Sequence, residues 1–347
     1  MRLLMITRKV DKDDAQAGFA YNWVKKLGER TEILKVICLE EGNTKDLPSN
    51  VEIFSLGKKK EKNRLKKFFN FQKGALKFIK KIDGVFCHQN PEYTILISPY
   101  AKIFNKKIVT WYSHKTITWQ LKLVNILADK ILTPTKESCG LDSKKKMITG
   151  HGVDINLFKP LDYDKKSEKL TIISVGRISP IKNYETLIES VSILKGRGID
   201  LKVKIVGLPG LISQANYFER LRQLVKEKQI DDHIIFLGGL PQYDLVKLYQ
   251  AADLSVNLCP TGSPDKAVLE SMACALPVLV CNKTFVPNFG PYHGQLLFKE
   301  KDSDDLAKKI VNLATNNQLE KIGLFLRRQI VEHHNLDNLL ERIIECF

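Results

Sequence analysis

The sequence predicts an α/β protein built from two doubly wound, Rossmann-like domains. Stretches with the apolar, β-branched character of strands alternate with stretches of helical periodicity, and the alternation runs through both halves of the chain. A chain of 347 residues is long enough for two domains of ordinary size. We therefore expect two parallel sheets covered by helices, which face each other across a cleft at the carboxyl ends of their strands.

The first domain is expected to span residues 1–160. Its strands are predicted at 2–7, 32–39, 51–56, 84–88, 107–114 and 130–135, and its helices near 18–28, 64–82, 93–104 and 117–129. This order is typical of a parallel sheet whose strands are joined by covering helices. No G-x-G-x-x-G motif follows the first strand, so a conventional nicotinamide or flavin domain is not expected.

The second domain is expected to span residues 161–330, after a linker at 157–169 that contains Pro160 and a run of charges. Its strands are predicted at 169–176, 202–207, 233–238, 254–259 and 277–281, and its helices near 183–196, 213–229, 241–251 and 265–275. Residues 317–347 have the pattern of terminal helices. The second half thus repeats the plan of the first.

Cysteine usage and hydropathy indicate a cytoplasmic protein. The seven cysteines are odd in number and form no C-x-x-C pair, which favours reduced thiols over a disulfide framework or a zinc site. The first apolar stretch is too short for a signal peptide, and no apolar run approaches the roughly 20 residues of a membrane span. We expect a soluble protein, or one bound peripherally to the inner face of the membrane.

The net charge of +16 is concentrated in the first half of the chain. Residues 1–150 contain 30 Lys/Arg and 15 Asp/Glu, a net of +15, whereas residues 151–347 contain 25 and 24, a net of +1. Such an asymmetry predicts an anionic partner for the first domain only.

Much of this charge lies in residues 58–81, which carry eleven basic residues and one acid, Glu61. We expect one apolar face of a helix to pack on the sheet while the lysines face an anionic membrane surface or an anionic acceptor. A solvated helix that only covers the domain is the alternative. No nucleic-acid-binding module is recognisable, so nucleic acid is not an expected partner. The apolar face is predicted at 65, 68, 69, 75, 76, 79 and 82, with Phe71 and Phe78 at its flanks.

The segment at 262–281, GSPDKAVLESMACALPVLVC, is the most informative about function. Ser263 suits a helix N-cap, Pro264 the first helical position, and Asp265 the positive end of the helix dipole. The free N–H groups of a helix N-terminus bind anions. Glu270, further along the helix, can accept hydrogen bonds from the hydroxyl pair of a sugar. The combination suits a nucleoside diphosphate.

This segment resembles the signature of the family-4 retaining glycosyltransferases, which have the two-domain GT-B fold and usually carry E-G-F-G-x-x-x-x-E-A-M-A-x-G-x-P-V. The run 270–273, ESMA, and the pair 277–278, PV, match the signature. The first Glu of the family falls at Gly262 and is missing. Asp265 is the nearest carboxylate and the candidate to replace it. The resemblance covers most of the chain, is strongest over 150–281, and implies that a last helix, 331–347, packs back on the first domain.

Two cations follow the first strand of the second domain. Arg177 and Lys182 match the family pattern V-G-R-x-x-x-x-K before a helix. Fixed positive charges at a strand end can hold a diphosphate and stabilise its charge as a glycosidic bond breaks. They supply what a divalent metal would otherwise supply, and no D-x-D motif is evident, so no metal ion and no cofactor is expected. A pair of ordinary solvated side chains is the alternative interpretation.

Other site residues are expected mainly through the resemblance. His114, at the end of the predicted strand 107–114, resembles the family histidine beside the donor sugar; a capping histidine is the alternative. Gly18 resembles the loop glycine that lets the backbone approach the donor. Gly239 and Leu240 resemble the segment that lines the nucleobase. The helix tip formed by Pro264, Asp265 and Lys266 would contact phosphate or sugar.

The remaining histidines give weaker signals. His88 suits packing at the core edge and acceptor binding equally well. His151 replaces an Asn that is usual in the family and is expected to be structural. The pair His333 and His334 is expected to be solvated, and no metal-ligand spacing is evident.

The resemblance implies a retaining, metal-independent glycosyltransferase of GT-B fold. It would move a sugar from a UDP- or GDP-linked donor to a hydroxyl of a glycan or lipid-linked acceptor, in cell-envelope or polysaccharide biosynthesis. Two alternatives stay open. The missing first Glu favours a nucleotide-sugar-binding module without transfer activity, and a sugar-nucleotide epimerase or hydrolase on the same fold is the other.

Overall fold

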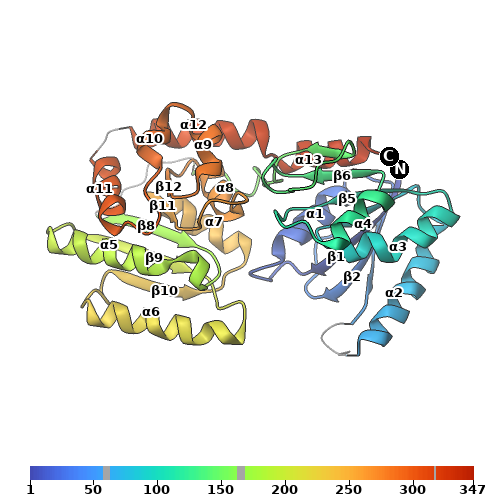
Figure 1. The fold of residues 1–347 in the computed structure, drawn as a ribbon, viewed down its shortest axis with the longest axis horizontal. Coiled ribbons are helices and arrows are strands. Elements are labelled where there is room, and N and C mark those ends of the chain that lie inside the picture. The colour runs from blue at the N-terminus through green and yellow to red at the C-terminus, as the bar shows by residue number, and fades with distance from the viewer. Residues whose placement is uncertain (58–62, 162–168, 316–317) are drawn as a thin grey trace. The chain divides into compact units, whose positions relative to one another are not determined.

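The computed structural model describes residues 1–57, 63–161, 169–315 and 318–347, which form two compact units (Figure 1). The first unit contains Met1–Asp154 and His334–Phe347, and the second contains Ile155–His333. Each unit is built around one sheet in which every strand pair is parallel. The predicted fold class, α/β with two doubly wound sheets, is confirmed.

The sheet of the first unit has the order β3-β2-β1-β4-β5-β6-β7. The strand order reverses between β1 and β4, which are hydrogen-bonded neighbours although β2 and β3 come between them in the chain. The sequence did not predict β7, whose three residues are too few to show an alternating pattern. The strands are β1 (Arg2–Val10), β2 (Ile33–Glu41), β3 (Val51–Ser55), β4 (Gly84–His88), β5 (Lys107–Trp111), β6 (Lys130–Thr133) and β7 (Lys146–Ile148).

Two apolar clusters cover the two faces of this sheet. Along β1, Leu4 and Ile6 belong to one cluster and Leu3 and Met5 to the other, as expected for a strand that is buried on both sides. The first cluster is shared with α2, α3 and α4, and the second with α1 and α13. The helices are α1 (Gly18–Gly28), α2 (Arg64–Ile79), α3 (Pro91–Ile103), α4 (Trp119–Leu127) and α13 (Leu336–Glu345).

The helix α13 closes the core of the first unit from the far end of the chain. It buries Leu336, Leu339, Leu340 and Ile343 against α1 and the sheet. The turn before it is tightly packed: at Gly152, where φ is +72°, an added Cβ would lie 2.7 Å from Leu339. A glycine is therefore required at this position.

His334, directly before α13, is buried rather than solvated. Its Nδ1 accepts the backbone N–H of His151 at 3.2 Å, and its carbonyl accepts the N–H of Val153 at 2.7 Å. The expectation of a solvated His333–His334 pair is therefore wrong for His334, because a parallel bridge between Val153 and Asn335 draws it into the first unit.

The buried face of α2 differs from the predicted one. Phe71, Ala75, Phe78 and Ile79 pack inward, together with Gly74. At Gly74 an added Cβ would lie 2.9 Å from the Phe54 ring, so the glycine allows close approach to the sheet. Four of the residues predicted to face inward are instead exposed: Leu65, Phe68, Phe69 and Leu76. Of the lysine-rich segment predicted at 58–81, residues 58–62 lie outside the described part.

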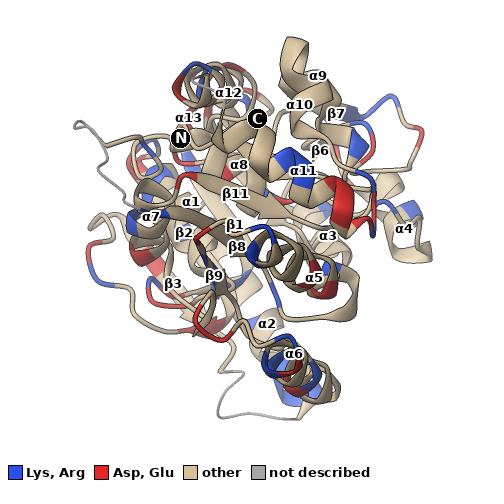
Figure 2. Ribbon diagram, turned by 90° about the vertical axis from the view of Figure 1, so that its left-hand side faces the viewer, with Lys and Arg blue, Asp and Glu red and all other residues tan. Residues whose placement is uncertain are grey.

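The sheet of the second unit has the order β10-β9-β8-β11-β12, with the reversal between β8 and β11. Its strands are β8 (Leu170–Val175), β9 (Leu201–Val206), β10 (Ile234–Gly238), β11 (Leu254–Asn257) and β12 (Val278–Val280). The flanking helices are α5 (Tyr184–Gly196), α6 (Ala215–Glu227), α7 (Gln242–Ala251), α8 (Lys266–Ala273), α9 (Val286–Phe289), α10 (His293–Leu296), α11 (Ser303–Ala314) and α12 (Leu319–His333). Acidic and basic positions are mixed along α5 and α6 (Figure 2). The sequence did not predict α9, α10 and α11. Within the predicted linker, residues 162–168 lie outside the described part.

Among the described residues, none of the helices combines the length and the apolar character needed to cross a membrane.

Candidate functional site

The candidate site lies at the strand-order reversal of the second sheet. Ligands of doubly wound sheets bind outside the carboxyl ends of the strands at such a reversal, because the loops that leave the two neighbouring strands turn to opposite sides. The loop after β8 carries Arg177 and Lys182, and the loop after β11 leads to Asp265 at the start of α8.

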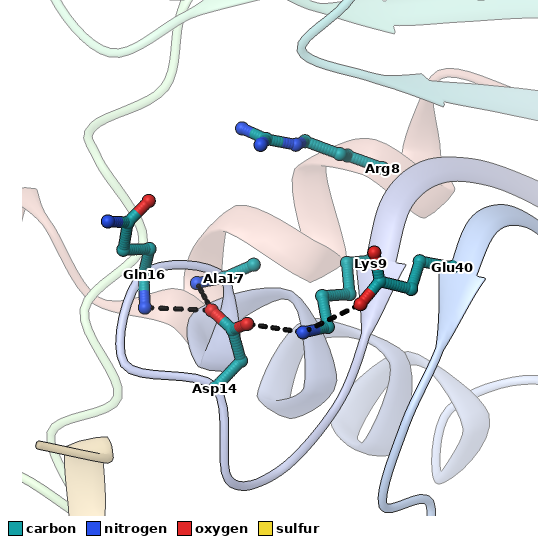
Figure 3. A pocket seen from close by; sticks show the side chains of 6 residues that line it. All are labelled: Arg8, Lys9, Asp14, Gln16, Ala17 and Glu40. Atoms are coloured by element: carbon teal, nitrogen blue, oxygen red, sulfur yellow. Dashed lines mark hydrogen bonds and ion pairs between the residues drawn. The ribbon is translucent and has the colours of Figure 1, made fainter. Parts of the chain in front are cut away.

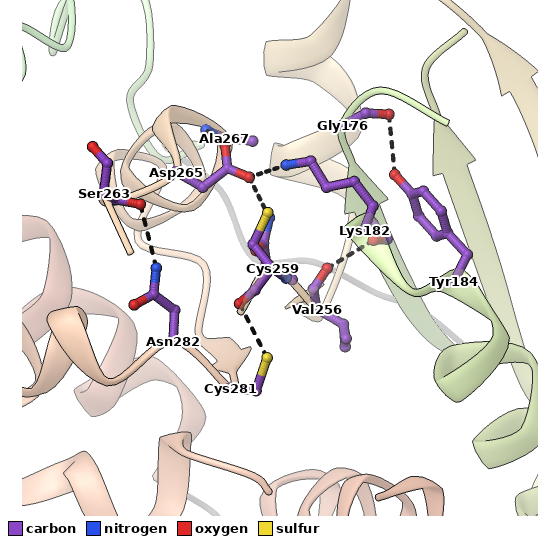
Figure 4. A network of polar contacts seen from close by, with 12 residues as sticks. Gly176, Lys182, Tyr184, Val256, Cys259, Ser263, Asp265, Ala267, Cys281 and Asn282 are labelled. Atoms are coloured by element: carbon purple, nitrogen blue, oxygen red, sulfur yellow. Dashed lines mark hydrogen bonds and ion pairs between the residues drawn. The ribbon is translucent and has the colours of Figure 1, made fainter. Parts of the chain in front are cut away.

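Lys182 and Asp265 form an ion pair between these two loops (Figure 4). The amide of Asn257, the last residue of β11, donates to the same carboxylate oxygen of Asp265 at 2.9 Å. The Cys259 thiol contacts both charged groups. Gly176 lies directly against the lysine, since a Cβ built there would be 3.1 Å from Lys182 Nζ. The ammonium group is thus fixed beside the end of β8.

The electrostatics of the pair keep both groups charged. Burial disfavours the ammonium form of Lys182, but the Asp265 carboxylate more than offsets this effect and raises the pKa of Lys182. Burial likewise disfavours the Asp265 carboxylate, but Lys182 and the Asn257 hydrogen bond outweigh it and lower the pKa of Asp265. Burial also raises the pKa of the Cys259 thiol. Lys182 therefore stays protonated and Asp265 ionised, so the end of the sheet holds a fixed ammonium group that is balanced by a carboxylate.

The start of α8 differs from the prediction. The N-cap is Asp265, whose carboxylate accepts the N–H of Ala267 at 3.3 Å, and the first helical residue is Lys266. Ser263 is not the cap and Pro264 is not in the helix, because the Asp265 side chain is drawn in by Lys182 and Asn257. Both carboxylate oxygens of Asp265 thus have protein partners in this structure.

Glu270 is the second buried carboxylate of the site. It is 5% exposed, and its Oε1 accepts a hydrogen bond from the Gln242 amide at 2.7 Å. Lys266 Nζ lies 3.9 Å from the same oxygen. Burial raises the pKa of Glu270 to about 7, against the opposing effects of Lys266 and Gln242. Gln242 begins α7 two residues after Leu240, so the segment Gly239–Leu240 is connected directly to this carboxylate.

Arg177 is exposed, in contrast to Lys182. Within the described part of the chain, no hydrogen bond or ion pair holds its guanidinium group. Its side chain lies beside Gly210, where an added Cβ would be 3.1 Å from Arg177 Cδ. The loop after β8 therefore carries Lys182, which Asp265 holds in place, and Arg177, whose guanidinium donors are all available for a ligand.

His114 and Gly18 belong to the first unit. The strand β5 ends at Trp111, so the prediction of a strand that reaches His114 is wrong; pairing with β6 stops at Trp111 and Leu132. His114 lies in the following loop, is exposed, and makes an isolated bridge to Cys139. Gly18 is the first residue of α1, and a Cβ there would meet only ordinary contacts, 3.5 Å from the Lys12 carbonyl oxygen.

The other first-unit histidines are packed in the core. His88 ends β4, its Nδ1 lies 3.0 Å from the Thr7 hydroxyl, and its ring stacks 4.6 Å from that of Trp23. His151 is buried with its ring 5.9 Å from that of Trp111. These contacts favour a structural role for both residues.

A polar cavity of about 90 Å³ lies near the end of β1. Figure 3 shows the side chains that line it. It lies by the ends of the neighbouring strands β1 and β2 and the loop before α1, and is lined by Arg8, Lys9, Asp14, Gln16, Ala17 and Glu40. Lys9 Nζ is held by the carboxylates of Asp14 and Glu40, whereas the Arg8 guanidinium makes no hydrogen bond or ion pair within the described part of the chain. The sequence did not predict this pocket, although Arg8 and Lys9 are charged residues near the end of a strand whose residues 3–6 are apolar.

Asn257 and Gln242 were also missed. Asn257 is a polar residue at the end of the buried strand β11, which is a recognisable signal at a strand-order reversal. Gln242 gave no signal, since its role depends on a contact with Glu270, 28 residues away.

A comparison with known proteins identifies a family that the second unit resembles. Residues 159–323 match the model of the family described as glycosyl transferases group 1. The putative colanic acid biosynthesis glycosyltransferase WcaL of Escherichia coli (strain K12) is 25% identical over 215 residues, which are 59% of this chain and 51% of WcaL. The probable sucrose-phosphate synthase of Thermosipho melanesiensis is 35% identical over 220 residues, 57% of this chain and 48% of that protein. The matches span about half the length of these curated relatives.

The solved structure of HepE from Anabaena in complex with UDP-glucose aligns with a TM-score of 0.77 at 16% identity, over 99% of this chain and 98% of that one. At this identity the likeness establishes the fold. The family match, in turn, falls on the unit that contains Lys182, Asp265 and Glu270. Residues 159–323 are therefore similar to the glycosyl transferases of group 1, and the two parallel sheets have the GT-B fold.

Proposed function

We propose that this protein is a retaining glycosyltransferase that takes its sugar from a UDP- or GDP-linked donor. The observation that carries the proposal is the buried Lys182 ammonium group at the strand-order reversal, with the available Arg177 guanidinium on the same loop. HepE, which shares the fold, has been solved with UDP-glucose. WcaL and sucrose-phosphate synthase, by their names, also handle sugars.

In this proposal the diphosphate binds to Arg177 and Lys182. An ammonium group has three donors, so Lys182 can bind a phosphate oxygen while it keeps its bond to Asp265. Backbone groups at the start of α8, around Pro264 and Lys266, face the phosphates or the sugar. The two cations supply the positive charge near the leaving group, and no metal ion is needed for that role.

Glu270 would bind the ribose. The Gln242 amide donates to Oε1 of Glu270, which leaves the second carboxylate oxygen to face a ligand. An ionised carboxylate can accept hydrogen bonds from two adjacent hydroxyls. The backbone of Gly239 and Leu240, which leads to Gln242, would contact the base. Asp265 is bound to Lys182, Asn257 and the α8 N-terminus, so we assign it to positioning Lys182 rather than to the sugar contact of the missing Glu at Gly262.

The transfer step breaks the bond between the anomeric carbon and the diphosphate oxygen. The acceptor hydroxyl forms the new bond to that carbon and gives its proton to the departing diphosphate. Arg177 and Lys182 stabilise the negative charge that develops on the diphosphate as the bond breaks. His114 would bind a sugar hydroxyl on the side of the first unit. No side chain is assigned as a covalent nucleophile.

The acceptor would be a hydroxyl of a glycan or of a lipid-linked sugar, as in cell-envelope polysaccharide synthesis. We assign the polar cavity of the first unit to acceptor hydroxyls, which Arg8 and Gln16 can bind while Lys9 occupies the carboxylates. Arg8→Ala should raise the acceptor KM and leave the donor KM unchanged. An unchanged acceptor KM would remove the assignment.

The test of the whole proposal begins with binding. A thermal-shift screen of UDP- and GDP-sugars should identify a donor, since a ligand at a hundred times its Kd stabilises by about 2.7 kcal/mol. The radiolabelled donor is then incubated with and without candidate acceptors. Label in a glycan product supports transfer. Release of free sugar alone indicates a hydrolase, an epimeric nucleotide-sugar indicates an epimerase, and binding without any reaction indicates a binding module, for which the glycine at 262 is the motivating observation.

A further inference from the structure

We propose that the outer face of α2 docks on an anionic lipid bilayer, with apolar side chains inserted among the acyl chains and lysines against the head groups. The outer face is defined here by Leu65, Phe68, Phe69 and Leu76 together with the basic residues beside them. This inference concerns a surface of the first unit. It does not depend on the proposed transfer reaction.

The apolar side chains of the outer face are exposed rather than buried in the core. Leu65, Phe68, Phe69 and Leu76 are 68%, 45%, 65% and 55% exposed. They occupy positions i, i+3, i+4 and i+11, which fall on one side of a helix. Side chains on the adjoining side of α2, such as Phe71 and Phe78, already fill the contact with the sheet. The apolar surface of the helix is therefore broader than the part that packs on the core, and these four residues form its exposed part.

A row of cations borders this apolar face. Four lysines with the spacing i, i+7, i+11 and i+14 lie along one edge of it: Lys66, Lys73, Lys77 and Lys80. Two of them, Lys66 and Lys77, directly follow Leu65 and Leu76 in the sequence. Lys77 is paired with Glu52, and the ammonium group of Lys80 lies 5.5 Å from the Phe104 ring centroid. The helix α2 itself contains no acidic residue. Exposed phenylalanines and leucines beside lysines are the composition of helices that lie in the interface of anionic membranes.

Charge decides between a bilayer and a protein as the occupant. A folded protein partner would present a defined set of acidic groups to specific lysines, whereas the excess of +15 over residues 1–150 attracts any extended anionic surface. Exposed apolar residues occur on the other helices of the same layer as well, at Ile103 on α3 and at Trp119 and Ile126 on α4. A broad, basic and partly apolar helical layer suits a lipid surface.

The test uses co-sedimentation of the full chain with vesicles of phosphatidylcholine alone and of phosphatidylcholine mixed with phosphatidylglycerol. We expect binding to the mixed vesicles only, with a loss as salt rises because the attraction is screened. The variant Phe68→Ser/Phe69→Ser should bind at least tenfold more weakly, since each buried Phe contributes apolar area. The variant Lys66→Gln/Lys73→Gln should lose roughly fivefold per lysine.

The matched control is Leu211→Ser/Leu324→Ser, which removes two leucines of similar exposure from the second unit and should bind vesicles like the unmodified protein. Circular dichroism and UDP affinity verify that every variant is folded, and a failure of UDP binding throughout would count against the proposed function but not against this surface. Equal binding to both vesicle types, or none to either, overturns the proposal. Self-association without lipid that disappears in Phe68→Ser/Phe69→Ser would assign the face to a second copy of the chain and overturn it too.

Discussion

Lys182 and Asp265 join the loops after β8 and β11, the two neighbouring strands at which the order of the second sheet reverses. The pair is largely buried, and Asp265 also caps α8. A single side chain thus fixes the cation of the proposed diphosphate site and sets where the following helix begins.

Asp265→Ala should lower the free energy of unfolding by far more than the loss of a helix cap alone would. It leaves the Lys182 ammonium buried without its carboxylate, and breaking a buried pair from one side costs roughly 3–5 kcal/mol, compared with about 1 kcal/mol for an N-cap. Urea unfolding measures the difference. Added UDP should stabilise this variant more than the unmodified protein, because a diphosphate supplies the missing negative charge.

The matched control for this experiment is Glu189→Ala. It breaks the exposed Lys228–Glu189 pair of the same unit, where both side chains are more than a third exposed. Such pairs contribute at most about 1 kcal/mol. Similar losses of stability in the two variants would show that burial of Lys182 and Asp265 does not matter.

Arg177→Ala should separate function from stability. The exposed guanidinium has no partner in the described part of the chain, so the free energy of unfolding should change by no more than about 0.5 kcal/mol. UDP affinity should fall roughly ten- to a hundredfold, the effect of one charge-assisted contact. Isothermal titration calorimetry provides the measurement, and Arg197→Ala, at the exposed end of α5, is the control that should bind UDP normally. Unchanged affinity in Arg177→Ala would leave the diphosphate to Lys182 alone.

Glu270 should make stability depend on pH in a defined window. Burial raises its pKa in the folded protein to about 7 from an ordinary value of 4.5. Between these two values the folded state binds more protons than the unfolded state, so stability falls as pH rises from about 4.5 to about 7. The change is on the order of 3 kcal/mol. Glu270→Gln, which keeps the shape, should remove this slope, and identical pH profiles would contradict the burial argument.

The same carboxylate should link donor binding to pH. The ionised form accepts both ribose hydroxyls, so UDP affinity should increase as pH rises through about 7. Glu270→Gln should bind UDP weakly at every pH. Competition titrations across this range provide the measurement, and a pH-independent affinity in the unmodified protein would remove Glu270 from the ribose site.

His114→Ala should lower transfer by roughly a hundredfold or more while UDP affinity and stability stay unchanged, because the side chain is exposed and lies in the first unit. Single-turnover transfer and UDP titration measure the two effects separately. His293→Ala replaces an equally exposed histidine of the second unit and should transfer at the normal rate. A normal transfer rate in His114→Ala would show that His114 is a structural loop residue and does not contact the sugar.

The sequence predicted both sheets because each strand is a short apolar run between helical segments, and this pattern is local. Arg177 and Lys182 could be selected for a similar reason, because they follow a strand and parallel strands bring their carboxyl ends to one edge. Glu270 could be selected from its place in the helix signature at 262–281. The start of α8 was predicted two residues early, since the choice of Asp265 as cap depends on Lys182, 83 residues away.

Which side of α2 is buried could not be predicted either. Both sides carry apolar residues at helical spacing, and the choice depends on the fit of Gly74 against Phe54 of β3. The end of β5 was misplaced because the run 107–114 keeps strand-like residues beyond the point where β6 stops pairing. In each case a contact distant in the sequence decides between two locally acceptable structures.

The position of α13 sets an order for folding during synthesis. The core of the first unit contains Leu336, Leu339, Leu340 and Ile343, so the ribosome must deliver the whole second unit before the first can bury its apolar surface completely. The second unit is one continuous segment and can fold as soon as it has emerged. The half of the chain that is made first is therefore the last to be completed, and the apolar surface that α13 covers stays exposed until α13 has been made.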